Sequence, residues 1–316
     1  MYYINYIMKS YIITGGAGFI GSHLTDRLLA DGHKVIVIDD FSLGKRENLQ
    51  KHKNLVVLKK SVTDNLAPIF KKYKVNGVFH LAALARVPFS IQYPRESHET
   101  NVNGTLNLLL AARDAQVKRF VFASSGSVYG DQKIPLVETM TCNPISPYGL
   151  QKYVGEEYCR LFALLYGMET VSLRYFNVYG PRQNPEGAYA NQISKFMDAY
   201  CTGFQPTIFG DGSVTRDNTY VADVVDATIL ASQTSNKKAF GDVFNIGAGK
   251  NFSVKETTQF ILDITGIKTW PKHGPARIEP HDALADNLKA KTVLAWKPNM
   301  DFEEGLLKTY EYFKNR

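Results

Sequence analysis

The sequence predicts an α/β protein built on a doubly wound parallel sheet, with a second, smaller mixed α/β lobe. From Tyr11 onward, short runs rich in β-branched residues alternate with longer amphipathic stretches, as in a parallel sheet covered by helices on both faces. A glycine-rich turn, Gly15 to Gly21, separates the first such run from the first amphipathic stretch. At 316 residues, the chain also exceeds the length at which a single hydrophobic core keeps growing.

Six strands and three helices follow in order along the first half of the chain. The expected strands are Tyr11 to Thr14, Lys34 to Asp39, Leu55 to Leu58, Gly77 to His80, Arg119 to Ala123 and Thr170 to Arg174. The expected helices are Phe19 to Ala30, Glu99 to Ala115 and Pro147 to Tyr166. Two successive βαβαβ halves of this kind form the Rossmann arrangement, with strand order 3-2-1-4-5-6 and a ligand crevice where that order reverses.

The regular alternation ends after Arg174, where prolines and glycines become frequent and the elements become shorter. We therefore expect the rest of the chain to form mostly a smaller lobe over the carboxyl edge of the sheet. Two stretches, Asn218 to Ser232 and Val243 to Ile246, are expected to return to the larger lobe. The predicted boundaries are 9–175 for the larger domain, with 214–249 partly returning to it, and 176–213 with 250–316 for the smaller one.

Composition argues against several classes of function. The net charge of +7 comes from lysines and arginines scattered along the chain, without the dense basic segment of a nucleic-acid-binding protein, and it suits a binder of nucleotide diphosphates. No apolar run is long enough to span a membrane, and no signal peptide is evident, so we expect a cytoplasmic protein. The three cysteines form no CxxC motif, and the histidines show no metal-binding spacing. We expect no metal, no membrane partner and no nucleic acid.

The glycine-rich turn predicts a dinucleotide site. Gly15, Gly18 and Gly21 permit a tight turn and close approach of the backbone to a pyrophosphate, while Phe19 and Ile20 open the helix whose N-terminus faces that negative charge. Asp39 ends the next strand, where a carboxylate accepts hydrogen bonds from an adenosine ribose and repels a 2′-phosphate. This favours NAD over NADP. A glycine turn without any ligand is the alternative.

A second motif places a tyrosine and a lysine one helical turn apart. Tyr148 and Lys152 share a helix face, so the lysine ammonium can lie near the tyrosine phenol. A free phenol has a pKa of about 10 and is a poor base at neutral pH, and a nearby ammonium favours its phenolate form. Ser124, Ser125 and Ser127 lie where the fifth strand ends and side chains reach the crevice. Taken alone, the pair is more often a solvated helix face and the serines are more often turn formers.

Together, the run TGGAGFIGSHL and the segment Ser146 to Lys152 resemble the extended short-chain dehydrogenase/reductases, and within them the NAD-dependent epimerase/dehydratase family. The resemblance covers nearly the whole chain from Lys9. It implies that Tyr148 is the catalytic base, that Lys152 supports it and binds the nicotinamide ribose, and that Ser125 orients the reacting sugar oxygen. Further cofactor contacts implied by the resemblance are Asp64, Ala82, Ala83, Asn101, Ser124 and Tyr175.

The residues after Ser125 distinguish the reactions of this family. Its 4,6-dehydratases carry an acidic pair after the serine or threonine, and its decarboxylases carry a glutamate there, whereas this chain has Gly126 and Ser127. The resemblance therefore favours a UDP-hexose 4-epimerase, in which the hydride returns to the opposite face of the same carbon. A reductase or 4,6-dehydratase remains the alternative enzyme, and a non-catalytic NAD- or sugar-nucleotide-binding protein is the second alternative.

The resemblance also implies a set of substrate contacts and a homodimer. Ala283 aligns with a position that is a bulky tyrosine in epimerases restricted to non-acetylated sugars, so a 2-acetamido group is expected to fit. The homodimer is expected to pack the helices holding Asn101 and Tyr148. The apolar residues Leu106, Leu109, Leu161 and Leu165 are compatible with this interface, and the alternative is that they belong to the ordinary core. The implied contacts to a UDP-sugar are Arg86, Ser125, Ser127, Tyr148, Asn177, Thr207, Phe209, Arg216, Arg277, Glu279 and Ala283.

Overall fold

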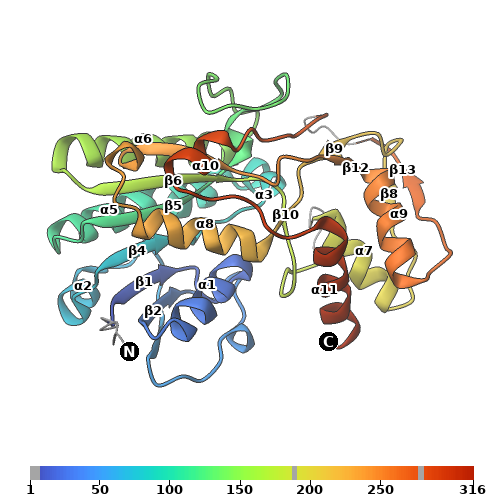
Figure 1. Ribbon diagram of the computed structural model, residues 1–316. Helices are drawn as coiled ribbons and strands as arrows, with labels where there is room; N and C mark the ends of the chain where they lie inside the picture. The colour runs from blue at the N-terminus through green and yellow to red at the C-terminus, as the bar shows by residue number, and fades with distance from the viewer. Residues whose placement is uncertain (1–7, 187–190, 277–280) are drawn as a thin grey trace, which may run out of the picture.

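A computed structural model describes residues 8–186, 191–276 and 281–316. A seven-stranded parallel sheet forms the larger lobe, in the order β11-β6-β5-β4-β1-β2-β3 (Figure 1). The strands are β1 (Ser10–Thr14), β2 (Lys34–Asp39), β3 (Leu55–Lys59), β4 (Gly77–His80), β5 (Arg119–Ser125), β6 (Glu169–Tyr175) and β11 (Asp242–Ile246). This confirms the predicted fold class and the order 3-2-1-4-5-6, to which β11 adds a seventh strand beside β6.

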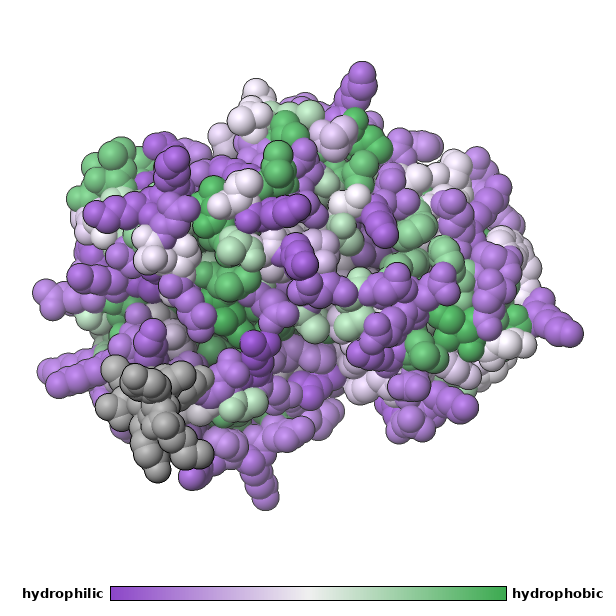
Figure 2. All heavy atoms as spheres, viewed as in Figure 1, coloured by the Kyte–Doolittle hydropathy of each residue, from purple (hydrophilic) through white to green (hydrophobic). Residues whose placement is uncertain are grey.

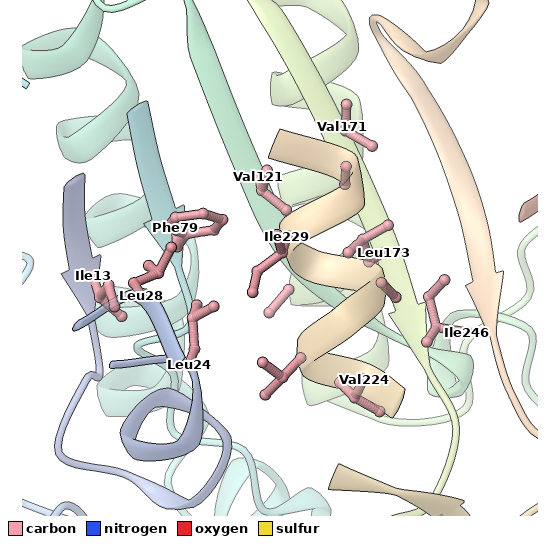
Figure 3. Close-up of a cluster of buried hydrophobic side chains, with 14 of the residues drawn as sticks. Ile13, Leu24, Leu28, Phe79, Val121, Val171, Leu173, Val224, Ile229 and Ile246 are labelled. Atoms are coloured by element: carbon pink, nitrogen blue, oxygen red, sulfur yellow. The ribbon is translucent and has the colours of Figure 1, made fainter. Parts of the chain in front are cut away.

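Helices cover both faces of this sheet. One face packs against α1 (Phe19–Ala30) and α8 (Val221–Gln233), and the other against α2 (Ala67–Tyr73), α5 (Gly104–Asp114) and α6 (Pro147–Tyr166). Neighbouring strand residues alternate between the two cores: Ile13 contributes to the first and Ile12 to the second. Figure 3 shows the first core, where α8, which carries Val224 and Ile229, lies over strands β5 and β6, with Ile246 of β11 beside it.

Local signals in the sequence fix the ends of the longest helix, α6. The Ser146 side chain accepts a hydrogen bond from the backbone N–H of Gly149, Pro147 occupies the first turn, and Gly167 ends the helix with a φ of 66°. The predicted bounds of α6 therefore agree with the structure. The predicted helix Glu99 to Ala115 differs, because it begins as a π-helix, Glu99–Asn103, before α5, and apolar periodicity does not report that change.

The smaller lobe surrounds a third hydrophobic core, formed mainly by α7 (Gln192–Cys201), α9 (Val254–Thr265) and α11 (Phe302–Lys314). Figure 1 shows it beside the carboxyl end of the sheet, on the right. Hydrophilic residues predominate on the face of the molecule seen in Figure 2, and hydrophobic ones occur there in patches. The short strands of the smaller lobe form three pairs. These are β8 (Thr207–Phe209) with β13 (Lys272–Gly274), β9 (Thr215–Arg216) with β12 (Phe252–Ser253), and β7 (Val178–Tyr179) with β10 (Thr219–Tyr220).

Shorter helical segments complete the described chain. They are α3 (Val87–Gln92), α4 (Pro94–His98), α10 (Leu288–Val293) and the 3₁₀ turns Arg46–Asn48, Gly126–Val128 and Lys237–Ala239. Among the described residues, no helix combines the length and the apolar character needed to cross a membrane.

The segment around α10 departs from the predicted domain boundary. Ala290, Leu294 and Trp296 are buried in the same core as α8, and the Trp296 indole donates a hydrogen bond to the backbone oxygen of Asp223 at 2.9 Å. The assignment of 250–316 entirely to the smaller lobe is therefore wrong for this part. The segment is too short to show a period, and its burial depends on a partner far away in sequence.

Candidate functional site

A cavity of about 680 Å³ opens at the carboxyl ends of the central strands, where the strand order reverses. Residues of both lobes line it. The structure brings together in this lining most of the cofactor-end and catalytic residues named from the sequence: Gly15, Gly18, Phe19, Ile20, Asp39, Ala82, Ala83, Arg86, Ser124, Ser125, Tyr148, Lys152, Tyr175 and Asn177.

The glycine turn forms a cradle that larger residues cannot form. Gly15 has a φ of 69°, and a Cβ there would lie 2.7 Å from the backbone nitrogen of Ala82. A Cβ at Gly21 would overlap the carbonyl oxygen of Gly15. Helix α1 follows without any side-chain cap, so its first N–H groups remain available to a ligand. These residues fit the pyrophosphate of a dinucleotide.

Asp39 is held in the cavity wall by the backbone around it. One carboxylate oxygen accepts a hydrogen bond from the N–H of Ala17, and the other accepts one from the N–H of Phe41, both at 2.9 Å. Burial raises the pKa of this carboxyl above its usual range, and the two backbone hydrogen bonds oppose that rise. Because a carboxylate has about four acceptor positions, capacity remains for ligand hydroxyl groups.

Tyr148 lies in the first turn of α6, where its backbone N–H donates to the Ser90 hydroxyl at 3.0 Å. Burial raises the pKa of its phenol to about 12, and a side-chain hydrogen bond with Ser125 opposes the rise. The Lys152 ammonium donates to the carbonyl oxygen of Ala123 at 2.7 Å and lies 5.8 Å from the centre of the Tyr148 ring. Burial lowers the pKa of Lys152 to about 8, and the charge of Glu156 opposes that change.

This geometry modifies the expectation that the lysine makes Tyr148 a phenolate. The ammonium is bonded to Ala123, and in the protein alone the phenol keeps its proton at neutral pH because its pKa lies near 12. A further positive charge or hydrogen-bond donor beside the phenol would favour ionisation of Tyr148.

The three serines at the end of β5 have different partners. The Ser125 oxygen accepts from the backbone N–H of Ser127 at 3.2 Å and from its hydroxyl at 2.9 Å, while its own side chain is hydrogen-bonded to the Tyr148 phenol. The Ser124 hydroxyl instead donates to the buried carboxylate of Glu156. Of the three, Ser125 is thus the hydroxyl paired with Tyr148, and Ser127 orients it.

Two residues expected at the cofactor lie outside the cavity lining. Asn101 is buried; its side-chain oxygen accepts from the N–H of Leu84, and its amide donates to the Gln151 side chain, each at 2.8 Å. It therefore joins the loop after β4 to α6 instead of contacting the cavity. The Asp64 carboxylate accepts from the N–H of Ser61 at 3.1 Å, and Ser61 itself lines the cavity.

Most residues expected to bind the far end of the substrate belong to the smaller lobe. Thr207 and Phe209 lie on β8, and Ala283 donates its backbone N–H to Thr215 at 3.2 Å; none of the three lines the cavity. Arg216, on β9, donates to the backbone oxygens of Thr215 at 2.7 Å and His281 at 3.2 Å. Arg277 and Glu279 lie outside the described residues.

The smaller lobe contributes cavity residues that the sequence did not reveal: Arg182, Gln183, Asn184, Pro185, Asn191, Tyr312 and Arg316. Arg182 forms an ion pair with Asp26 of α1 at 2.7 Å, and the His23 ring, also on α1, is hydrogen-bonded to the oxygen of Pro181 at 2.9 Å. The only sequence signal was that Arg182 follows Gly180 and Pro181. The last helix gave no sign that its end reaches the cavity.

A buried aspartate organises the loops between the lobes. The Asp217 carboxylate accepts hydrogen bonds from the backbone N–H groups of Ala248 at 2.7 Å, Gly249 at 3.0 Å and Ala285 at 3.1 Å. Burial raises the pKa of the Asp217 carboxyl to about 6 despite these bonds.

The described residues contain no group of three or more histidine, cysteine, aspartate or glutamate side chains arranged for a metal ion.

Comparison with known proteins gives a consistent result. Residues 11–247 match the model of the NAD dependent epimerase/dehydratase family. The chain is 40% identical to a UDP-glucose 4-epimerase of Mycolicibacterium smegmatis, over 96% of this chain and 98% of the relative. A crystal structure of a Thermotoga maritima UDP-glucose 4-epimerase with UDP-glucose superposes with a TM-score of 0.92 at 41% identity, covering 97% of this chain and 99% of that one. The UDP-N-acetylglucosamine 4-epimerase of Methanobrevibacter ruminantium, in complex with UDP-N-acetylmuramic acid, gives a TM-score of 0.92 at 38% identity, covering 97% and 98%.

Proposed function

Because the chain belongs to the NAD-dependent epimerase/dehydratase family, and is therefore an enzyme that uses NAD, we propose that it is a 4-epimerase of UDP-hexoses. It interconverts UDP-N-acetylglucosamine with UDP-N-acetylgalactosamine, and UDP-glucose with UDP-galactose, through a transient 4-keto sugar. The observation that carries the proposal is the pairing of Ser125 with Tyr148 beside Lys152, followed by Gly126 and Ser127 instead of an acid.

The cradle at Gly15 and Gly18, the carboxylate of Asp39 and the ammonium of Lys152 would hold the cofactor. When bound, NAD supplies a hydride acceptor and a positive charge on its oxidised ring. A positive charge beside Tyr148 would favour its phenolate, because burial raises the pKa of the phenol to about 12.

Tyr148 then removes the proton from the C4 hydroxyl of the sugar, and Ser125 donates a hydrogen bond to the same oxygen. Lys152 keeps a positive charge close to the phenolate. Its pKa of about 8 leaves it largely protonated at neutral pH. Once the sugar has turned in the site and the C4 hydride has returned to the opposite face of the carbon, Tyr148 returns the proton to the C4 oxygen. Over a full turnover, Tyr148 neither gains nor loses a proton.

The charge distribution of the cavity supports epimerisation over elimination. Within its described lining, the acidic residues are Asp39, Asp40 and Glu47, which all belong to the end of β2 and the segment after it. None follows Ser125, so no carboxyl group there supplies the acid or base that loss of water requires. A reductase or a 4,6-dehydratase would instead leave a lasting absorbance change or a 4-keto product.

Support for two substrates comes from the relatives and from one small side chain. The Thermotoga maritima structure holds UDP-glucose, and the Methanobrevibacter ruminantium enzyme is named for UDP-N-acetylglucosamine. A methyl group at Ala283 leaves room for an acetamido substituent. We assign the diphosphate to Asn177, Arg216 and Arg277, the uridine to Thr207, Phe209 and Glu279, and the sugar to Arg86, Ser125, Ser127, Tyr148 and Ala283.

The experiment that tests this function is NMR spectroscopy of two separate mixtures. One contains the NAD-loaded enzyme with UDP-galactose, and the other contains it with UDP-N-acetylgalactosamine. We expect both to equilibrate with their 4-epimers. Equilibration of only one of the two sugars would restrict the substrate range to that sugar. Accumulation of a 4-keto or deoxygenated product would contradict the proposed reaction.

A homodimer is part of the same proposal. Leu165 is 65% exposed and Leu150 is 52% exposed on α6, and the partly buried Leu106 of α5 and Leu161 of α6 lie on the same side of the larger lobe. These four leucines form the proposed dimer surface. For Leu109, which was compatible with either a dimer surface or the core, the structure shows the core, because it is fully buried beneath α5 and is not available to a partner.

A further inference from the structure

A buried ion pair lies directly behind the proposed catalytic residues. Arg174 of β6 donates from Nε to one oxygen of the Glu156 carboxylate at 2.9 Å and from Nη2 to the other at 2.7 Å. Both side chains are more than nine-tenths buried. Such a pair is costly to desolvate and contributes little net stability, so its burial behind these residues points to a role beyond stability.

We propose that Glu156, held by Arg174, is a positioning residue for the epimerase reaction, which fixes the end of β5 through Ser124 and provides the countercharge for the Lys152 ammonium. This inference rests on the proposed function. Glu156 is not itself part of the cavity lining and does not touch the reacting atoms, so it acts through Ser124 and Lys152, which do line the cavity.

The first part of the role is geometric. Two consecutive residues of β5 are tied to side chains one turn apart on α6: Ala123 accepts from Lys152 at 2.7 Å, and Ser124 donates to Glu156. The next residue, Ser125, is the one that pairs with Tyr148. The two ties therefore fix the strand just before Ser125 relative to the helix that carries Tyr148.

The second part of the role is electrostatic. Among the described residues, the ionisable groups that interact with Lys152 are Tyr148, Glu156 and Cys159 of α6 and His80 of β4, with Arg174 beyond the carboxylate of Glu156. Burial raises the pKa of Cys159 to about 12 and lowers that of His80 to about 3, so both are neutral near pH 7.

The phenol of Tyr148 is also neutral in the protein alone. This leaves Glu156 as the anion that faces Lys152 within the described part of the chain. Removing it would leave two buried cations, Lys152 and Arg174, without their countercharge, and Lys152 would then lose its proton at lower pH.

The decisive experiment compares Glu156→Gln with Glu157→Gln in the NAD-loaded protein. Glu157 is the matched control, because it lies next in the same helix, is 40% exposed and forms a surface ion pair with Arg160. For Glu156→Gln, we expect the alkaline limb of the kcat–pH profile to move down by about one pH unit. The profile of Glu157→Gln should match the wild type. A Glu156→Gln profile that also matches the wild type overturns the inference.

Ser124→Ala removes the hydrogen bond between β5 and Glu156 without removing either buried charge. It therefore tests the positioning role even if Glu156→Gln does not fold. We expect kcat to fall about tenfold, with an unchanged alkaline limb and little change in KM. Unchanged kcat in Ser124→Ala overturns the positioning role.

Hydrogen–deuterium exchange of the peptide covering residues 119–130 separates this inference from the proposed function, because it needs no turnover. Ser124→Ala should exchange faster there than the wild type, and Glu157→Gln should not. Equal exchange in Ser124→Ala and the wild type counts against the inference, whereas absence of 4-epimerisation by the wild type counts against the proposed function alone.

Discussion

Lys152 lies 5.8 Å from the centre of the Tyr148 ring, yet its ammonium is hydrogen-bonded to the backbone of Ala123. The lysine therefore acts on the tyrosine through its charge and not through a direct hydrogen bond to the phenol. Because a charge effect depends on protonation and on nearby countercharges, the pH dependence of this pair is informative.

Tyr148→Phe should lose most turnover while keeping bound NAD, because it removes the proposed proton acceptor and leaves the ring in place. We expect kcat to fall about 10²- to 10⁴-fold, which is the usual range for removal of a general base. Initial rates give kcat, and the absorbance of cofactor released on denaturation gives the NAD content. Tyr153→Phe, on the same helix, is the control and should remain active.

Wild-type activity should decline as the pH rises through about 8, where buried Lys152 loses its proton. Lys152→Arg keeps its charge to far higher pH, so whatever activity it retains should lack this limb. The measurement is the kcat–pH profile of both proteins. An alkaline limb in Lys152→Arg that matches the wild type would assign the limb to another group.

Loss of the Lys152 proton should lower the activity but raise the free energy of unfolding as the pH increases. Unfolded lysine titrates near 10.4 and native Lys152 near 8, so between those values the unfolded chain binds the extra proton. Its contribution to the free energy of unfolding therefore rises with pH from about 8 to about 10. Denaturant unfolding of wild type and Lys152→Met at several pH values measures it. The variant should show a smaller rise.

Gly21→Ala should abolish NAD binding, because the added methyl group would overlap the carbonyl oxygen of Gly15 in the cradle. Forced repacking there should also lower the free energy of unfolding by about 1–3 kcal/mol. Gly167→Ala is the control, since its Cβ meets nothing within 4 Å and only its φ of 66° is unfavourable. It should lose about 1 kcal/mol of stability and keep its cofactor. NAD binding is followed by quenching of protein fluorescence.

Ala283→Tyr should reduce kcat/KM for UDP-N-acetylgalactosamine about tenfold more than for UDP-galactose, because the ring would occupy the space assigned to the acetamido group. Ala283→Ser, which adds a single oxygen, should leave the ratio of the two kcat/KM values nearly unchanged. Equal losses on both sugars in the tyrosine variant would exclude Ala283 as a specificity residue.

Leu165→Glu should weaken the proposed dimer, since it places a charge on the surface formed by α5 and α6. Sedimentation equilibrium is expected to show a shift toward monomer. Leu307→Glu changes a leucine that is 44% exposed on α11 of the smaller lobe, and it should leave the oligomeric state as it is in the wild type. If the wild type is already monomeric, the dimer proposal fails.

The sequence predicted best what local chemistry determines. The bounds of α6 follow from Ser146, Pro147 and Gly167, and the strands follow from β-branched runs, so these elements agree with the structure. The direction of the Ser124 hydroxyl did not follow, because it depends on the distant carboxylate of Glu156. Likewise, only tertiary packing determines that Leu109 is buried and that Trp296 returns to the sheet.

The contacts between the smaller lobe and helix α1 bear on how firmly the enzyme retains its cofactor. Arg182 is paired with Asp26, and the Pro181 oxygen with His23, so the smaller lobe contacts α1, the helix whose N-terminus we propose to face the cofactor. We expect these contacts to help retain NAD in the cavity. A cofactor retained in this way is restored by each turnover and serves as a built-in oxidant. Epimerisation would then run at a rate independent of the ambient ratio of oxidised to reduced NAD.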